Sequence, residues 1–131
     1  MKALLLSALI SMLCGCVGAP AVTNAEALSP DELNRRSTEL DGAGVVVRGY
    51  LVHEAEALGL WDSKAAEEKG EAAKCVSLLY PDSIRQNAIR ANRKEVVVRG
   101  VFRKDVTANG GLFLGLCNYS GVIVNSVDGQ G

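Results

Sequence analysis

The sequence predicts a mainly β fold: a closed barrel of five strands, with one helix before the first strand and another between the third and fourth. Three observations predict it. Short segments rich in β-branched residues recur along the chain, two of them carry a glycine in mid-strand, and 131 residues suffice for one domain with one core. The composition, 48% hydrophobic and 22% charged, excludes a disordered or collagen-like chain.

The first residues have the pattern of an export signal. Lys2 supplies a positive charge, and the apolar run from Ala3 to Leu13 is too short to span a bilayer, which takes about 20 residues. The segment Leu13-Cys14-Gly15-Cys16 then resembles the lipobox of bacterial lipoproteins. The resemblance implies cleavage before Cys16 and acylation of its sulfur, which would anchor the protein stably in a membrane.

The lipobox divides the chain into a signal peptide at 1–15, a lipidated tether at 16–28 and a folded domain at 29–127. Because Val17 rather than Asp follows the cysteine, the resemblance implies an outer-membrane lipoprotein that faces the periplasm. The alternative is cleavage after Ala21, since Ala19-Pro20-Ala21 offers an ordinary cleavage pattern. That processing would give a soluble periplasmic protein.

Two cysteines remain in the mature chain, Cys75 and Cys117. An exported protein enters an oxidising compartment, where two surviving cysteines are expected to form a disulfide. Closing a loop of about 40 residues would stabilise the fold by about 4 kcal/mol in the chain-entropy model. The alternative is a pair of buried free thiols. The sequence contains no C-x-x-C pair, so a thioredoxin-like role has little support.

Capping residues predict the first helix. Ser29 suits the N-cap, Pro30 fits the first turn and Glu32 completes a capping box. We expect this helix to end at Asp41-Gly42, because glycine favours helix C-termini. A second helix is predicted from Ile84 to Asn92.

Runs of β-branched residues predict the strands. The first four are expected at Val45–His53, Leu58–Trp61, Cys75–Tyr80 and Glu95–Arg103. The turn Asn109-Gly110-Gly111 is a strong hairpin signal. We therefore expect the fifth strand at Leu112–Leu116, and the apolar segment Val122–Val127 would extend it.

The sequence Val-Val-Val-Arg-Gly occurs twice, at 45–49 and 96–100. Five residues are too few to establish a duplication, so we interpret them as one local solution used in two strands. Strand alternation points the valines inward and places Gly49 and Gly100 in mid-strand. Glycine normally weakens a strand, so each one indicates a bulge or a sharp bend, which a small closed barrel requires.

Three strands, a helix and two strands is the plan of the OB-fold, a five-stranded Greek-key barrel. Four segments resemble small exported OB-fold lipoproteins of proteobacteria, most of them uncharacterised: Val47-Arg48-Gly49-Tyr50-Leu51, Leu60-Trp61-Asp62-Ser63, Cys75-Val76-Ser77-Leu78 and Val98-Arg99-Gly100-Val101-Phe102. The resemblance covers residues 41 to 127 and implies parallel, neighbouring third and fifth strands. Cys75 would then open the third strand and Cys117 close the fifth, so their bond would need an offset or a bend at Gly115.

No set of residues predicts catalysis. His53 is the single histidine, near Glu54 and Glu56, and a metal site there is conceivable. Adjacent strand residues point to opposite faces, however, so exposed edge residues are the simpler explanation. Neither a nucleophile elbow nor a phosphate-binding glycine loop occurs in the sequence. We therefore expect no enzyme, no metal site and no cofactor.

The net charge of −1 conceals an uneven distribution. Acidic residues dominate from Glu54 to Glu71, and basic residues dominate from Arg85 to Lys104. An OB-fold binds ligands on its second and third strands, where this chain offers aromatic side chains, whereas the arginines are expected on the second helix and the fourth strand. The candidate binding residues are Tyr50, Trp61, Tyr80, Arg90, Arg93, Arg99 and Arg103.

Together these features predict a non-enzymatic envelope lipoprotein with an OB-fold binding module. Its basic surface would suit an envelope protein or an acidic envelope component. One alternative is a periplasmic binder of an oligosaccharide or small ligand through the face that carries Trp61. Another is a single-stranded nucleic-acid-binding protein that uses the arginines, which the low net charge and the 5% aromatic content disfavour.

Overall fold

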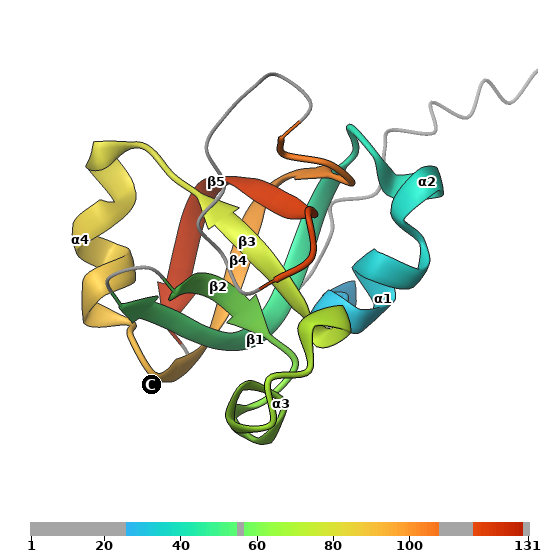
Figure 1. The fold of residues 1–131 in the computed structure, drawn as a ribbon. Coiled ribbons are helices and arrows are strands. Elements are labelled where there is room, and N and C mark those ends of the chain that lie inside the picture. Colours follow the sequence, from blue (N-terminus) through green and yellow to red (C-terminus); the bar gives the residue numbers. More distant parts are fainter. Residues whose placement is uncertain (1–25, 55–56, 108–116, 130–131) are drawn as a thin grey trace, which may run out of the picture.

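The computed structural model describes residues 26–54, 57–107 and 117–129. Its strands are β1 (Gly44–Glu54), β2 (Ala57–Trp61), β3 (Cys75–Leu79), β4 (Lys94–Arg103) and β5 (Gly121–Gly129) (Figure 1). Its helices are α1 (Pro30–Arg35), α2 (Ser37–Leu40), α3 (Lys64–Glu68) and α4 (Asp82–Arg90), together with a 3-10 turn, η2 (Ala72–Lys74). None of the helices in these three ranges is long and apolar enough to cross a membrane.

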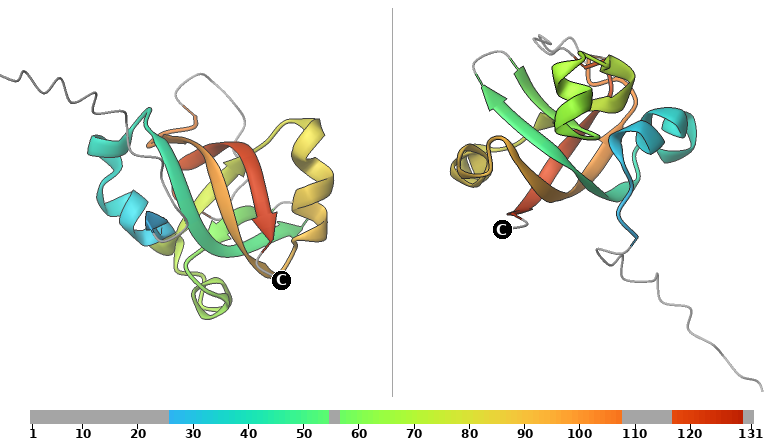
Figure 2. Two further views of the ribbon diagram at one scale, coloured as in Figure 1. Left: turned by 180° about the vertical axis from the view of Figure 1, so that it is seen from behind. Right: turned by 90° about the horizontal axis from the view of Figure 1, so that it is seen from below.

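The five strands form a closed barrel in the order β1-β2-β3-β5-β4, with β4 pairing back onto β1. β3 and β5 run parallel, and every other neighbouring pair is antiparallel. Figure 2 shows α1 and α2 on one side of the barrel and α4 on the opposite side. The predictions of a mainly β, closed five-stranded fold and of parallel third and fifth strands are confirmed.

The inward faces of β1 and β4 build the core, as the alternation predicts. The residues from these two strands in one buried cluster are Val45, Val47, Leu51, Val96, Val98 and Phe102. Leu33 of α1 joins the same cluster, so the first helix is attached by a buried side chain. Each such side chain removed from water contributes about 1.5–3 kcal/mol of transfer free energy, which makes this cluster the main source of stability.

Both mid-strand glycines occupy tight positions. A Cβ on Gly49 would lie 2.5 Å from the backbone oxygen of Trp61. Gly100 stands at a β-bulge, because the register of β4 against β5 shifts between Arg99 and Gly100 and leaves Asn125 without a partner in β4. The prediction of a bulge or bend is confirmed at Gly100, and at Gly49 the close approach of β2 explains why no side chain is present.

The helices differ from prediction in three ways. The first one is interrupted at Arg36, which divides it into α1 and α2 instead of one helix that reaches Asp41-Gly42. α4 begins and ends two residues earlier than predicted. The charged segment 64–71 is expected to be a solvated loop or a helical turn, and it does form the short helix α3. It is not fully solvated, however, because Ala66 is buried, and the Ser63 hydroxyl accepts a hydrogen bond from the Ala66 N–H at 3.1 Å.

The fifth strand lies later in the chain than the prediction placed it. The predicted strand at Leu112–Leu116 falls outside the described residues, and Val122–Val127 is instead the body of β5. Cys117 therefore precedes β5 rather than closing the strand. Because β3 and β5 are parallel, Cys75 and Cys117 lie at the same end, where they form the predicted disulfide with their Cα atoms 5.1 Å apart. No offset at Gly115 is needed.

α1 is fixed to this end of the barrel by Asn34. Its amide nitrogen donates to the carbonyl oxygens of Ala73 and Cys75 at 2.8 and 2.9 Å. Its amide oxygen accepts from the Ser120 hydroxyl at 2.5 Å. One side chain thus joins α1, the start of β3 and the segment before β5, and it sets where α1 lies along the barrel.

Candidate functional site

The predicted aromatic residues on β1 and β2 are buried. Tyr50 and Trp61 are register partners on the outer face of the barrel, and they are 6% and 3% exposed. They pack in a second apolar cluster with Ala66 of α3 and with the two cysteines of the disulfide. α3 and the disulfide cover these two rings, and a binding role for Tyr50 and Trp61 stays a prediction.

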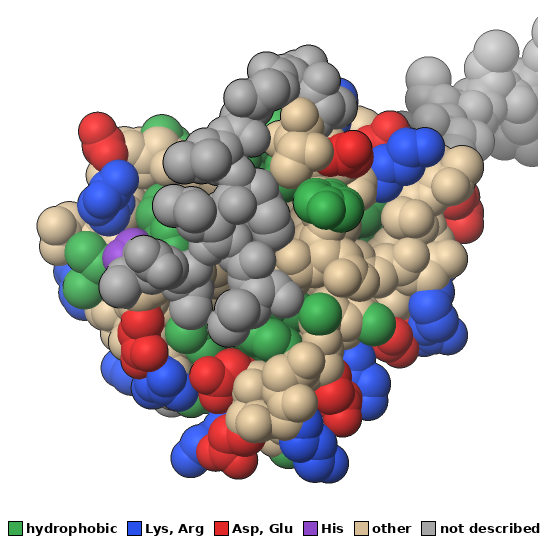
Figure 3. Space-filling model, in the orientation of Figure 1, with side chains coloured by type: hydrophobic (Ala, Val, Ile, Leu, Met, Phe, Trp, Pro, Cys, Tyr) green, Lys and Arg blue, Asp and Glu red, His purple; other side chains and the backbone are tan. Residues whose placement is uncertain are grey.

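The four predicted arginines do not share one surface. Arg90 lies on α4, Arg93 precedes β4, and Arg99 and Arg103 alternate with the inward residues of β4. Arg99 and Arg103 lie 3.9 Å from carboxylates of this chain, those of Asp128 and Asp41 respectively. On the face seen in Figure 3, basic side chains lie beside acidic ones. On this face the basic side chains therefore do not form a continuous basic patch.

Arg93 is the most strongly engaged of the four. Its guanidinium binds both carboxylate oxygens of Glu54, at 2.6 and 2.9 Å, and lies 3.7 Å from Glu67 of α3. This hydrogen-bonded pairing lowers the pKa of Glu54. The backbone of Arg93 has φ +60°, and its N–H donates to the Leu51 carbonyl at 2.7 Å. Arg93 therefore joins β1, α3 and the start of β4, which is a structural role.

A groove of about 230 Å³ lies between α1 and the outer face of β1. One wall is the segment 27–29, which runs along β1 because the Leu28 N–H donates to the Val46 carbonyl at 2.8 Å and the Arg48 N–H donates to the Leu28 carbonyl at 2.9 Å. Side chains from four places in the chain complete the lining: Ser29, Glu32, Arg48, Asp62 and Glu95.

The lining of this groove is acidic. It includes three carboxylates, those of Glu32, Asp62 and Glu95, and one guanidinium, that of Arg48. Burial raises the pKa of Asp62, and the carboxylates of Asp31 and Glu32 raise it further. The hydrogen bond that its Oδ1 accepts from the Asp31 N–H at 2.9 Å and the charge of Lys74 act in the opposite direction. A group with a raised pKa loses stability in its charged form, and a cation placed beside it would restore that stability. The groove therefore has the electrostatics of a site for a positive group.

The sequence patterns did not indicate this groove. In the sequence, helix capping already explains Glu32, and in the structure its N–H donates a hydrogen bond to the Ser29 hydroxyl at 3.1 Å. Glu95 is the lone acid in a basic run. The pairing of 27–29 with β1 brings α1 and its Glu32 to the groove, and a single parallel bridge at Leu28 leaves no periodic signal in the sequence.

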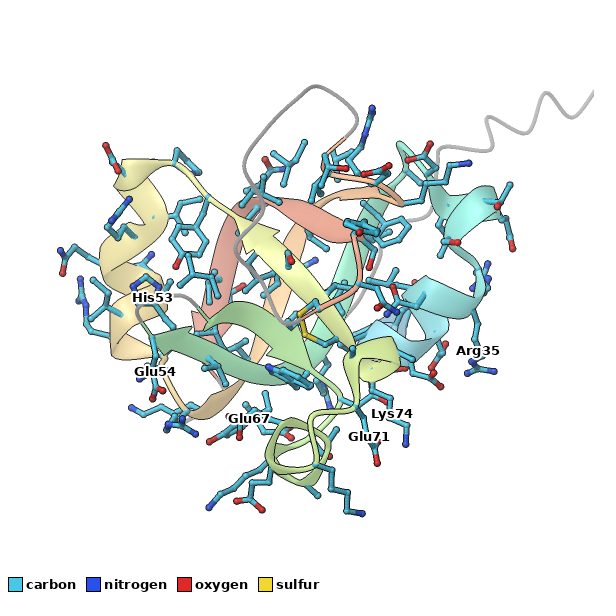
Figure 4. The ribbon with its side chains drawn as sticks, in the orientation of Figure 1. Arg35, His53, Glu54, Glu67, Glu71 and Lys74 are labelled. Atoms are coloured by element: carbon cyan, nitrogen blue, oxygen red, sulfur yellow. A yellow bond between two sulfur atoms is a disulfide. The ribbon has the colours of Figure 1, made fainter. Side chains whose placement is uncertain are left out.

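His53 and Tyr80 form a polar cluster near α4. Figure 4 shows His53 at the end of β1, beside this helix. Its Nδ1 is hydrogen-bonded to the Tyr80 hydroxyl, and the two rings stack with centroids 5.7 Å apart. Burial lowers the pKa of His53 and the Arg85 guanidinium lowers it further, whereas burial raises the pKa of Tyr80. Tyr80, a predicted binding residue, is thus engaged by His53. Within the described ranges, no three metal-ligating side chains gather into a group.

Comparison with known proteins finds no matching family model and no matching curated protein. Among the solved structures that match, two have low identity and TM-scores below 0.5. "OBody AM3L15 bound to hen egg-white lysozyme" is 16% identical, with 71% of this chain and 85% of that chain covered and a TM-score of 0.45. Asparaginyl-tRNA synthetase from Pyrococcus horikoshii, complexed with asparaginyl-adenylate, is 17% identical, with 86% of this chain but 23% of that chain covered and a TM-score of 0.42. Neither likeness assigns a function.

Proposed function

We propose that this protein is a non-enzymatic binding module with an OB-fold-like barrel, held on the periplasmic side of the outer membrane by a lipid on Cys16. The strand order β1-β2-β3-β5-β4, with α4 between β3 and β4, supports the fold. The segment Leu13-Cys14-Gly15-Cys16 supports the anchor.

The acidic groove is the binding site in this proposal, and its ligand is a cationic group. The observation that carries the proposal is the convergence of Glu32, Asp62 and Glu95, from three separate elements, on one groove that contains one guanidinium. A primary amine or guanidinium would pair with these carboxylates through charge-assisted hydrogen bonds. Basic side chains of an envelope protein present such groups.

The alternative surfaces are less suited to a ligand. The face that carries Trp61 is covered by α3 and the disulfide, which disfavours an oligosaccharide stacked on that ring. Three of the four arginines contact carboxylates of this chain, which disfavours contacts with the phosphates of a nucleic acid. An acidic partner would also be repelled by the groove. A basic partner therefore replaces the acidic one that the sequence suggested.

Calorimetric titration with tetralysine and tetraglutamate tests this proposal. We expect tetralysine to bind, with an affinity that falls as salt rises, and tetraglutamate not to bind. Glu32→Gln and Glu95→Gln should each weaken tetralysine binding about fivefold, the effect of about 1 kcal/mol for a partly exposed ion pair. Glu68→Gln on α3 removes the same charge outside the groove and should leave the affinity unchanged. Equal effects of all three substitutions would exclude the groove, and absence of tetralysine binding would exclude the ligand class.

A further inference from the structure

α4 has few apolar contacts with the barrel. Ala88 is buried, Ile84 packs partly buried against the core, and Ala91 at the C-cap is buried in the same core cluster. Ile89 of the same helix is exposed. Two alanines and a half-buried isoleucine provide far less transfer free energy than a leucine-rich helix face would. Polar contacts at the ends of α4 therefore contribute a large share of what holds this helix in place.

His53 provides these contacts at the junction of three elements. It lies near the end of β1, its ring bonds and stacks on Tyr80, which follows β3, and its backbone N–H donates to the Asn92 side chain at 2.8 Å, just after α4. Asn92 in turn precedes β4. One residue thus links the ends of β1 and β3 to the segment that leaves α4.

We propose that His53 is a pH-sensitive latch between β1 and α4: the neutral imidazole holds the helix against the barrel, and protonation of the imidazole loosens it. The Tyr80 hydroxyl can donate to a neutral Nδ1 or accept from a protonated one, so this hydrogen bond does not decide the direction of the effect. Two other features decide it. The ring is partly buried, and the charged side chain that acts on it from α4 is a cation, Arg85.

The other charged groups around the ring do not offset this effect. Asp82 of α4 lies 3.4 Å from Arg85, but its side chain is almost fully exposed. Glu54, next to His53 on β1, points to the opposite face of the strand and is bound to the Arg93 guanidinium. A proton on His53 therefore adds a second positive charge beside Arg85, and movement of α4 away from the barrel relieves both the repulsion and the burial.

The direction of the pH effect follows from linkage. In the closed state the pKa of His53 lies below its ordinary value of about 6.5, and in the open state it returns toward that value. The open state therefore binds the proton more tightly, and closure weakens as the pH falls below about 6.5. Each unit of difference between the two pKa values raises the opening constant about tenfold once His53 is protonated.

Because His53 is the only histidine, its Cε1–H gives a single NMR resonance that can be titrated without assignment. We expect a midpoint below 6.5 and, over the same pH range, faster hydrogen exchange of α4 amides relative to β4 amides. Arg85→Gln should raise the midpoint. Arg90→Gln removes the same charge from the same helix, where its Nε donates to the Gln86 carbonyl, and should leave the midpoint unchanged.

Two outcomes would overturn the latch. One is a midpoint at or above 6.5 in the unsubstituted protein. The other is an α4-to-β4 exchange ratio that stays flat through the midpoint. His53→Gln should make the ratio independent of pH, and a pH step that persists in this variant would assign the effect to another group. If His53→Gln does not fold, the comparison of the His53 midpoints in Arg85→Gln and Arg90→Gln still tests the latch.

Discussion

Gly49→Ala should destabilise the protein strongly, whereas Gly44→Ala on the same strand should not. The new Cβ at position 49 would lie 2.5 Å from the Trp61 carbonyl oxygen and 2.8 Å from Leu60 Cγ, so one neighbour must move by about 0.7 Å to restore a normal contact. The carbonyl belongs to the β1–β2 ladder, in which Tyr50 pairs with Trp61. Overpacking costs about 1–3 kcal/mol and a weakened ladder hydrogen bond about 1 kcal/mol, so we expect a loss of about 3 kcal/mol.

Position 44 provides the matched control, because nothing lies within 4 Å of its Cβ. There the same substitution should change the free energy of unfolding by less than about 1 kcal/mol and can stabilise through the unfolded chain. Urea denaturation followed by the fluorescence of the single tryptophan measures both variants. A difference between the two variants below 0.5 kcal/mol (about the scatter of such measurements) would refute the argument that the approach of β2 excludes a side chain from position 49.

Two further substitutions test the disulfide and the core. Replacing both Cys75 and Cys117 by alanine should lower the free energy of unfolding by about 4 kcal/mol, because the disulfide closes a loop with a sequence separation of 42. The unreduced protein is the reference. A loss below about 1 kcal/mol would contradict the chain-entropy model. Phe102→Ala should cost about 3–5 kcal/mol, since Phe102 is 0% exposed in the core cluster. Leu79→Ala, at a position 41% exposed, should cost far less, and equal losses measured by urea denaturation would contradict this assignment of the core.

Most of the strands could be predicted from the sequence because strand patterns are local. The alternation in Val-Val-Val-Arg-Gly depends only on neighbours along the chain, and β1 and β4 follow it. The predicted start at Ser29 and end at Asp41 of the first helical segment are confirmed, but its interruption at Arg36 was missed, because no glycine or proline marks the break. The prediction placed the fifth strand too early in the chain because it followed the glycine-rich signal at 109–111. No local signal shows which of the two apolar segments after it pairs with β3.

The candidate sites were harder to predict because they depend on contacts between distant segments. Arg93 lies in a basic run of the sequence, but in the fold the end of β1 brings Glu54, 39 residues away along the chain, into a salt bridge with it. Trp61 is covered by a helix that follows it by three residues and by a disulfide whose second cysteine lies far downstream. His53 and Tyr80 meet only when β1 and β3 enter one barrel. Residue types are visible in the sequence, but their partners are not.

The proposed anchor and the proposed groove constrain one another. Residues 27–29 form one wall of the groove, and they directly continue the tether from Cys16. Position 27 is eleven residue steps from position 16, and a fully extended chain spans at most about 3.3–3.6 Å per residue, so on a lipidated Cys16 the groove can lie no more than about 40 Å from the lipid. With the proposed anchor, a partner that enters the groove must therefore present its cationic group within about 40 Å of the lipid. Insertion of a flexible segment after Cys16 should leave tetralysine affinity unchanged in solution while it alters capture of a membrane-bound partner, because only the second process depends on reach.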